Sequence, residues 1–147
     1  MNRIELYTLV GETLHLSQVF ELHLRILISI FNDNFGTEID EDALILKEDK
    51  KTLGVLLKEL KKKTSLDQAG KEIFQEALQK RNYIAHDFFI KNTFAFEGQE
   101  EFEIVMEKLK EDQTVIIKAT LISQGFVEGI CQALKIDKSS ILIKQST

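Results

Sequence analysis

Apolar side chains recur every three or four residues along four stretches of this chain, a spacing that places them on one face of an α-helix. Proline, the commonest helix breaker, is absent from all 147 residues, so long helices are allowed. The pattern predicts four helices, over residues 3–33, 50–63, 66–91 and 99–135. Four amphipathic helices with mostly short connections are typical of an up-and-down four-helix bundle. The sequence therefore predicts one all-α domain over residues 1–147, with room for a short extra element at the C-terminus.

The first predicted helix is apolar on nearly every side between residues 19 and 31. A helix that faces one core and water needs only one apolar face, so a second face is expected to be buried as well. Two coverings fit this pattern. A second copy of the chain is the simpler one and predicts a homodimer. The alternative is a centrally packed helix covered by the C-terminal residues around Ile141, Leu142 and Ile143.

Cysteine usage and apolar run lengths indicate the compartment. Cys131 is the only cysteine, which excludes an intrachain disulfide framework and a cysteine-based zinc site and favours a reducing compartment. Its helical neighbours are apolar, so Cys131 is expected in the core. The N-terminus has no basic segment leading into an apolar run, and Arg25 and Ser29 interrupt the longest apolar stretch. These features predict a cytoplasmic protein without a membrane segment.

Charge is distributed unevenly along the chain. With a formal net charge of −5 and a pI near 5.3, the whole chain is not suited to tight non-specific nucleic-acid binding, which depends on phosphate neutralisation. The second predicted helix is a local exception, because it carries a basic patch. Its candidate RNA-binding residues are Lys58, Lys61, Lys62 and Lys63. The alternative is a solvated helix end whose lysines are favoured by the helix dipole.

The third predicted helix carries an arginine where an apolar side chain would be expected. Arg81 falls near the middle of the apolar arc of this helix. A buried guanidinium needs a carboxylate, a phosphate or several carbonyls as partners, and the first helix offers Glu12 and Glu21. Asn82 and His86 are four residues apart, so they share one flank and can address one ligand. Histidine ordinarily titrates near neutral pH and can therefore serve as general base or acid.

The three histidines give little support to a metal site. They are spread over two predicted helices without an H-E-x-x-H or comparable ligand pattern. His15 and His23 are expected to be structural, because neither has a potential site residue at suggestive spacing. Gly-rich phosphate loops and nucleophilic triads are also lacking. The sequence predicts neither a metal nor a cofactor.

Two segments carry a resemblance to a known family. The run over residues 77–89, which contains Arg81-Asn82-Tyr83-Ile84-Ala85-His86, resembles the R-N-x-x-x-H segment of the HEPN superfamily of small helical bundles. The segment Thr52-Leu53-Gly54-Val55-Leu56 resembles the Thr-Leu-Gly-x-Leu stretch of many such proteins. The superfamily includes RNA-cleaving toxins and phage-defence effectors, and also members that only bind nucleotides or protein partners.

The resemblance implies a metal-independent endoribonuclease whose site lies at a homodimer interface. Arg81 would hold and stabilise the scissile phosphate, His86 would transfer the proton, and Asn82 would orient the histidine or the phosphate. A cognate antitoxin or a nucleotidyltransferase would be the protein partner. The chemistry is physically coherent, because the 2′-hydroxyl of RNA is an internal nucleophile and the protein needs to supply only charge stabilisation and proton transfer.

Two other readings of the same residues stay open. In the first, the protein is a non-catalytic module that binds a nucleotide or a regulatory partner through Arg81 and His86. In the second, it is a structural dimer in which Arg81 forms a satisfied core ion pair. An open cleft on which Arg81, Asn82 and His86 converge favours the ribonuclease or the binding module, whereas a closed pair between Arg81 and a glutamate favours the structural dimer.

Overall fold

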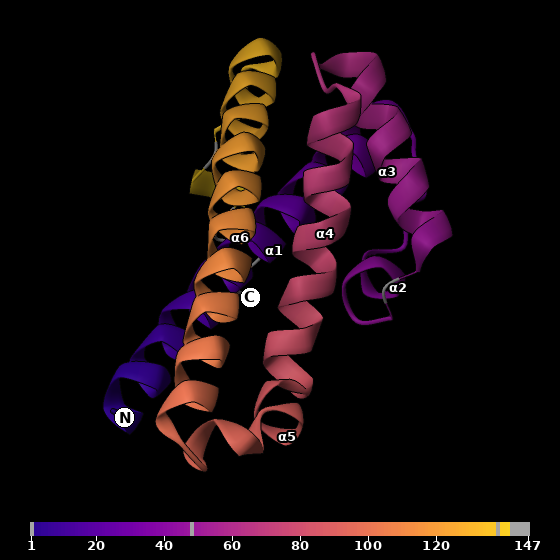
Figure 1. Cartoon of the computed structure of the whole chain (residues 1–147). Coiled ribbons are helices and arrows are strands. Elements are labelled where there is room, and N and C mark those ends of the chain that lie inside the picture. Colours follow the sequence, from indigo (N-terminus) through magenta and orange to yellow (C-terminus); the bar gives the residue numbers. More distant parts are fainter. Residues whose placement is uncertain (1, 48, 138, 142–147) are drawn as a thin grey trace.

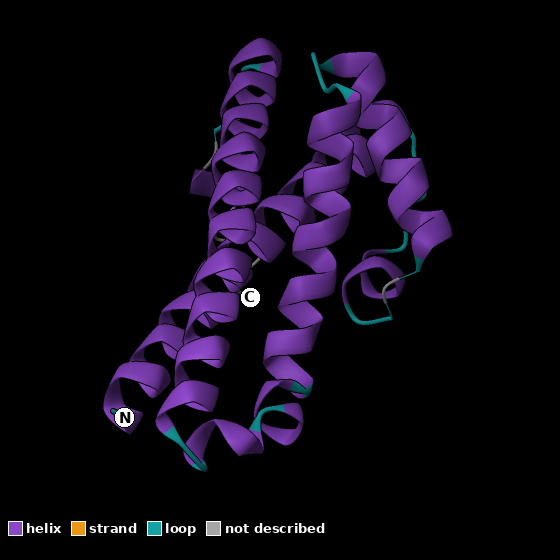
Figure 2. Cartoon of the chain, in the orientation of Figure 1, coloured by secondary structure: helices purple, strands orange, loops and turns teal. Residues whose placement is uncertain are grey.

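The computed structural model describes residues 2–47, 49–137 and 139–141, and every regular element in this part of the chain is a helix (Figure 2). The all-α prediction is therefore confirmed. The elements are α1 (Arg3–Phe35), α2 (Glu41–Ile45), α3 (Lys50–Lys63), α4 (Gln68–His86), α5 (Phe88–Lys91), the 3-10 helix η1 (Thr93–Phe96) and α6 (Gln99–Leu134). The backbone of residues 139–141 is also helical, at the place where a short extra element was expected.

The four long helices begin and end close to the predicted residues, because polar side chains and glycine mark their ends. Asp49 caps α3 through the Lys51 amide, and Asp67 caps α4 through the Gly70 amide at 2.8 Å. Gly36 ends α1 with a φ of +68°, a left-handed conformation that glycine adopts without strain.

Two short elements and one break were not predicted. α2 is only five residues long, and η1 is only four, so neither has enough turns to show an apolar period. The predicted helix over residues 66–91 was wrong in its length, because α4 ends at His86 and α5 begins at Phe88. Asp87 lies between them with a φ of −118°, far from the helical value.

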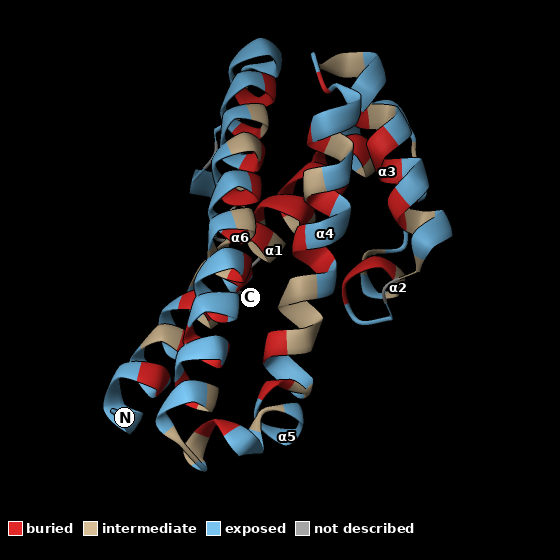
Figure 3. Cartoon of the chain, in the orientation of Figure 1, coloured by how far each residue is buried: buried red, intermediate tan, exposed pale blue. Residues whose placement is uncertain are grey.

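α1 is the central helix of the structure and crosses behind both α4 and α6, while α3 lies on the outer side of α4 (Figure 1). The buried positions of these helices lie on the sides that face one another (Figure 3). Phe20 on α1 and Phe74 on α4 meet edge to face, with ring centroids 5.4 Å apart, and both are fully buried. Cys131 is buried on α6, as the sequence predicted.

The second apolar face of α1 is covered within a single chain. The residues of this segment that are at most 2% exposed are Phe20, Leu24, Ile26, Leu27, Ile28, Ile30 and Phe31. The apolar faces of α1 are thus buried within one chain, as in the centrally packed alternative, so they do not call for a second subunit, and the homodimer stays a prediction. Ile141 packs against the core as expected, whereas Leu142 and Ile143 lie outside the described residues.

Two helices are long and apolar enough to cross a membrane by length and composition alone. α1 and α6 each contain an 18-residue window with a mean hydropathy of 1.3, of which 50% and 39% respectively are buried inside the structure. Core helices of soluble proteins meet the same criterion. A cytoplasmic protein without a membrane segment therefore stays a prediction.

Candidate functional site

Arg81, Asn82 and His86 all lie on the last two turns of α4, but they face different neighbours. With 3.6 residues per turn, Asn82 and His86 are about 40° apart around the helix, whereas Arg81 and His86 are about 140° apart. Arg81 points to α1, where its ion-pair partner lies. Asn82 and His86 line a hollow on the side of α2.

Arg81 forms the ion pair that its place in the apolar arc predicted. Its Nη2 lies 2.8 Å and its Nε 3.1 Å from Oε2 of Glu21, and the two side chains are only 14% and 15% exposed. Of the two candidate carboxylates, Glu21 is thus the partner, whereas Glu12 is exposed elsewhere on α1. This pair fastens the end of α4 to the middle of α1.

Glu21 also binds a second arginine, which the sequence analysis did not identify. Oε1 of Glu21 lies 2.9 Å from Nη2 and 3.1 Å from Nε of Arg25, one turn further along α1. Arg25 also pairs with Glu41 on α2. Burial acts to lower the pKa of Arg25, but its bonds to Glu41 and Glu21 outweigh this effect and raise that pKa. The only sequence signal was an arginine that interrupts an apolar run four residues after a glutamate.

Glu21 does not accept a hydrogen bond from every N–H group of Arg81. The Nη1 group donates to Oδ1 of Asn82 at 2.5 Å. A guanidinium has five N–H donors, and the bonds to Glu21 and Asn82 use three of them. The other two N–H groups have no protein acceptor in the described part of the chain, so an anion that reaches the guanidinium can still be bound.

Asn82 and His86 line one surface cleft of about 340 Å³. Tyr83 and Asp87 complete its α4 side, and Lys47 from the segment after α2 stands opposite. His86 is exposed and has no hydrogen-bond or ion-pair partner among the described residues, so its ring nitrogens are available to a ligand. Arg81 does not line this cleft and is connected to it through Asn82.

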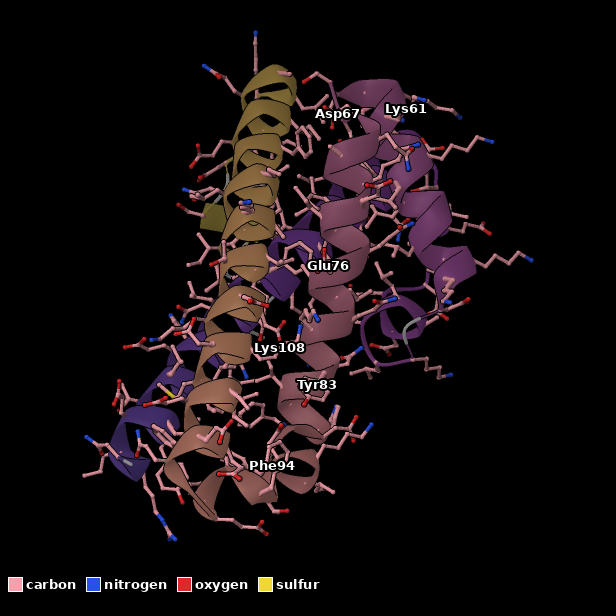
Figure 4. The ribbon with its side chains drawn as sticks, in the orientation of Figure 1. Lys61, Asp67, Glu76, Tyr83, Phe94 and Lys108 are labelled. Carbon is pink, nitrogen blue, oxygen red and sulfur yellow. The ribbon has the colours of Figure 1, made fainter. Side chains whose placement is uncertain are left out.

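The predicted lysine patch lies at the opposite end of α4 from His86 (Figure 4). Lys61 is near Asp67 at the start of α4, and Tyr83 is 16 residues further on, about 24 Å at the helical rise of 1.5 Å per residue. Lys58 and Lys61 are exposed without a salt bridge in the described part of the chain. The structure therefore separates the lysine patch from the motif on α4.

Two lysines of that patch have structural partners. Glu59 lies 2.7 Å from Lys63 and 3.4 Å from Lys62, and the hydrogen bond from Lys63 contributes most to lowering the pKa of Glu59. The Lys63 ammonium also lies 4.3 Å from the ring centroid of Phe35. Lys62 is therefore an exposed lysine at the helix end, whereas Lys63 is largely buried against Glu59 and Phe35.

α4 is held on its other side by a buried carboxylate. Asp112 on α6 is 2% exposed and lies 3.1 Å from Lys80 and 3.2 Å from Lys108. The hydrogen bond to Asp112 is the main cause that raises the pKa of Lys108. Lys80 and Arg81 are adjacent and bind carboxylates on different helices, which fixes the rotation of α4 about its axis.

The other two histidines lie away from this site. His23 is 7% exposed, and its Nδ1 lies 2.7 Å from Oγ of Ser123. The Ser123 hydroxyl donates its hydrogen to the Thr120 carbonyl, so His23 donates to Ser123 and ties α1 to α6. The structural role expected for His23 is thus confirmed. His15 is exposed on α1. Among the described residues, no three His, Cys, Asp or Glu side chains form a group that could hold a metal ion.

Comparison with known proteins finds no relative of this chain. No protein-family model, no curated protein and no solved structure matches the chain.

Proposed function

We propose that this protein is a metal-independent endoribonuclease of the toxin or defence type, resembling the HEPN superfamily and built as an up-and-down four-helix bundle of α1, α3, α4 and α6. The observation that carries the proposal is the shared cleft of Asn82 and His86, with Arg81 attached behind it. A histidine, an amide and an arginine are the groups that phosphodiester cleavage by an internal nucleophile requires.

In the proposed reaction, the 2′-hydroxyl oxygen of RNA attacks the adjacent phosphorus and the bond to the 5′-oxygen breaks. One proton leaves the 2′-hydroxyl and another reaches the departing 5′-oxygen. His86 transfers one of these protons, and in this proposal the phosphate reaches past Asn82 to the two remaining N–H groups of Arg81, which stabilise its charge. The products carry a 2′,3′-cyclic phosphate and a 5′-hydroxyl, and DNA is inert because it lacks the nucleophile.

A homodimer is part of the proposal, because the cleft of one chain contains a single histidine for two proton transfers. Exposed apolar side chains lie at this end of the molecule, on α5 and η1 after α4 and on the first turns of α1: Phe89, Ile90, Phe94, Ile4 and Tyr7. Tyr7 and Phe89 are in contact, with ring centroids 5.8 Å apart, and Phe89 follows His86 by three residues. Pairing of two such surfaces about a two-fold axis would bring both copies of His86 to one rim.

A second function is favoured by one specific observation. The closed pair between Arg81 and Glu21 is the arrangement expected for a structural dimer, and it leaves Asn82 and His86 to line a cleft that suits a module binding a nucleotide or a regulatory protein without cleaving RNA. A cognate antitoxin or nucleotidyltransferase is the proposed protein partner in either case. The two functions differ in whether RNA is broken.

His86→Ala tests the cleavage directly, with His15→Ala as a matched control at an exposed histidine on α1. A mixed-sequence RNA is incubated with each purified protein in EDTA, and the ends of the products are analysed. We expect wild type and His15→Ala to leave 2′,3′-cyclic phosphate ends. Because His86 is the proton-transfer group, His86→Ala should be slower by roughly 10²–10⁴-fold and should keep its fold.

The ribonuclease proposal fails if wild type cleaves no RNA with or without EDTA, or if His86→Ala cleaves as fast as His15→Ala. Binding of a nucleotide or protein at the Asn82 cleft without cleavage would then establish the binding module instead.

A further inference from the structure

Four polar side chains form a stripe along the outer side of α4. Gln75, Gln79, Asn82 and His86 follow one another at intervals of four, three and four residues, the spacing that keeps side chains on one face of a helix. The stripe rises about 16.5 Å from its first to its last residue at 1.5 Å per residue. The three amide side chains therefore form a line along the helix that leads to His86.

Two hollows lie next to each other on this side of α4. A hollow of about 250 Å³ is lined by Gln75 and Gln79 on α4 and by Lys50 at the start of α3. Gln79 also lines the cleft of about 340 Å³ that contains His86 and Lys47. Gln79 lines both hollows, so they adjoin along α4, and we refer to them together as the groove, with the amide stripe on one side and the two lysines on the other.

Two exposed lysines lie beside these hollows. Lys47 and Lys50 are exposed, and neither has a salt bridge in the described part of the chain. Among the described residues that line the two hollows, Lys47 and Lys50 are the cations and Asp87 is the acid, whereas Glu48, between the two lysines in the sequence, lies outside the described residues. Asp49 lies close by, but its carboxylate is occupied with capping α3 and with the Thr52 hydroxyl at 2.7 Å.

We infer that the groove binds a short stretch of single-stranded RNA and leads it to His86. Lys47 and Lys50 pair with phosphates, the amides of Gln75 and Gln79 hydrogen-bond base edges, and Tyr83 offers a ring beside the path. At a spacing of 3.4 Å or more per phosphate, the stripe spans at most about five nucleotides. The identity of the ligand rests on the proposed function, whereas the groove itself rests on geometry.

Charge reversal at matched sites tests this path. All proteins carry His86→Ala so that RNA is bound and not cut, and binding of a fluorescein-labelled single-stranded RNA of about ten nucleotides is followed by anisotropy against salt. Lys47→Glu with Lys50→Glu alters the groove. The control, Lys61→Glu with Lys62→Glu, makes the same charge change at the far end of α3. Thermal unfolding verifies each fold, and the neutral pair Lys47→Gln with Lys50→Gln replaces the groove variant if it does not fold.

We expect the groove variant to bind roughly tenfold or more weakly than the control, and loss of two phosphate contacts should reduce the slope of log K against log salt by about 1.4. Gln79→Ala should weaken binding without changing that slope. The inference would be overturned if the control pair weakened RNA binding as much as the groove variant does. It would also be overturned if the protein carrying His86→Ala alone bound no RNA. Competition by poly-glutamate as strong as that of unlabelled RNA would assign the groove to acidic peptides instead. RNA that binds in the groove but is not cut by the protein with His86 intact refutes only the ribonuclease proposal.

Discussion

Arg81→Ala should destabilise the protein, because the side chain removed makes three hydrogen bonds in a half-buried environment. Two of them go to Glu21, which is only 15% exposed. The variant leaves one carboxylate oxygen of Glu21 without its partner and detaches the end of α4 from α1. The expected loss therefore arises from the folded state and does not depend on any ligand.

Its size follows from the surroundings of Glu21. Removal of one partner from a fully buried ion pair typically costs about 3–5 kcal/mol. Both side chains here keep some access to water, and Glu21 still has Arg25. The expected cost of Arg81→Ala is therefore lower, about 2–3 kcal/mol. Arg81→Lys keeps the charge but loses the two-point geometry, so about 1 kcal/mol is expected.

A double-mutant cycle measured by urea unfolding isolates the coupling free energy between Arg81 and Glu21. It compares wild type with Arg81→Ala, Glu21→Ala and the double variant. We expect a favourable coupling, and Arg81→Lys should unfold between wild type and Arg81→Ala. If both single Arg81 variants unfold within about 0.5 kcal/mol of wild type, as substitutions at exposed sites usually do, the position of Arg81 against α1 is refuted.

Two further predictions concern assembly and the start of α3. Sedimentation at tens of micromolar should show a homodimer, since an interface of standard size would normally hold at such concentrations. Ile90→Glu should dissociate the dimer, whereas Leu121→Glu at an exposed site on α6 should not. A monomeric wild type would refute a site built from two copies of the chain. Asp49→Ala should lower the urea midpoint by removing the α3 cap, whereas Asp49→Asn keeps the cap. Hydrogen bonds from Thr52 and the Lys51 amide lower the pKa of Asp49 in the folded protein. The stabilisation by the ionised Asp49 cap is therefore fully present above the ordinary aspartate pKa, and it is lost as the pH falls through the lowered pKa of Asp49. Equal pH dependence of wild type and Asp49→Ala would contradict that assignment.

The long helices could be predicted from the sequence because their signals are local. The apolar period of 3.6 residues and the capping residues depend only on neighbours along the chain. The second helix was predicted over 50–63, the residues that α3 occupies, and the fourth was predicted to within one residue of α6. α2 and the break at Asp87 are shorter than the window in which such a period can be recognised, so they were missed.

For the candidate site, the sequence determined which side chains share a face of α4, since helix geometry alone places Asn82 beside His86 and turns Arg81 toward the core. It also required a partner for Arg81. Only the tertiary structure decided that this partner is Glu21, that Glu21 is shared with Arg25, and that Lys47 and Lys50 lie across from the amide stripe while Lys61 lies at the far end. The reason is that a helical period specifies the direction of a side chain from its own axis, whereas the side chains that it meets depend on how separate helices pack.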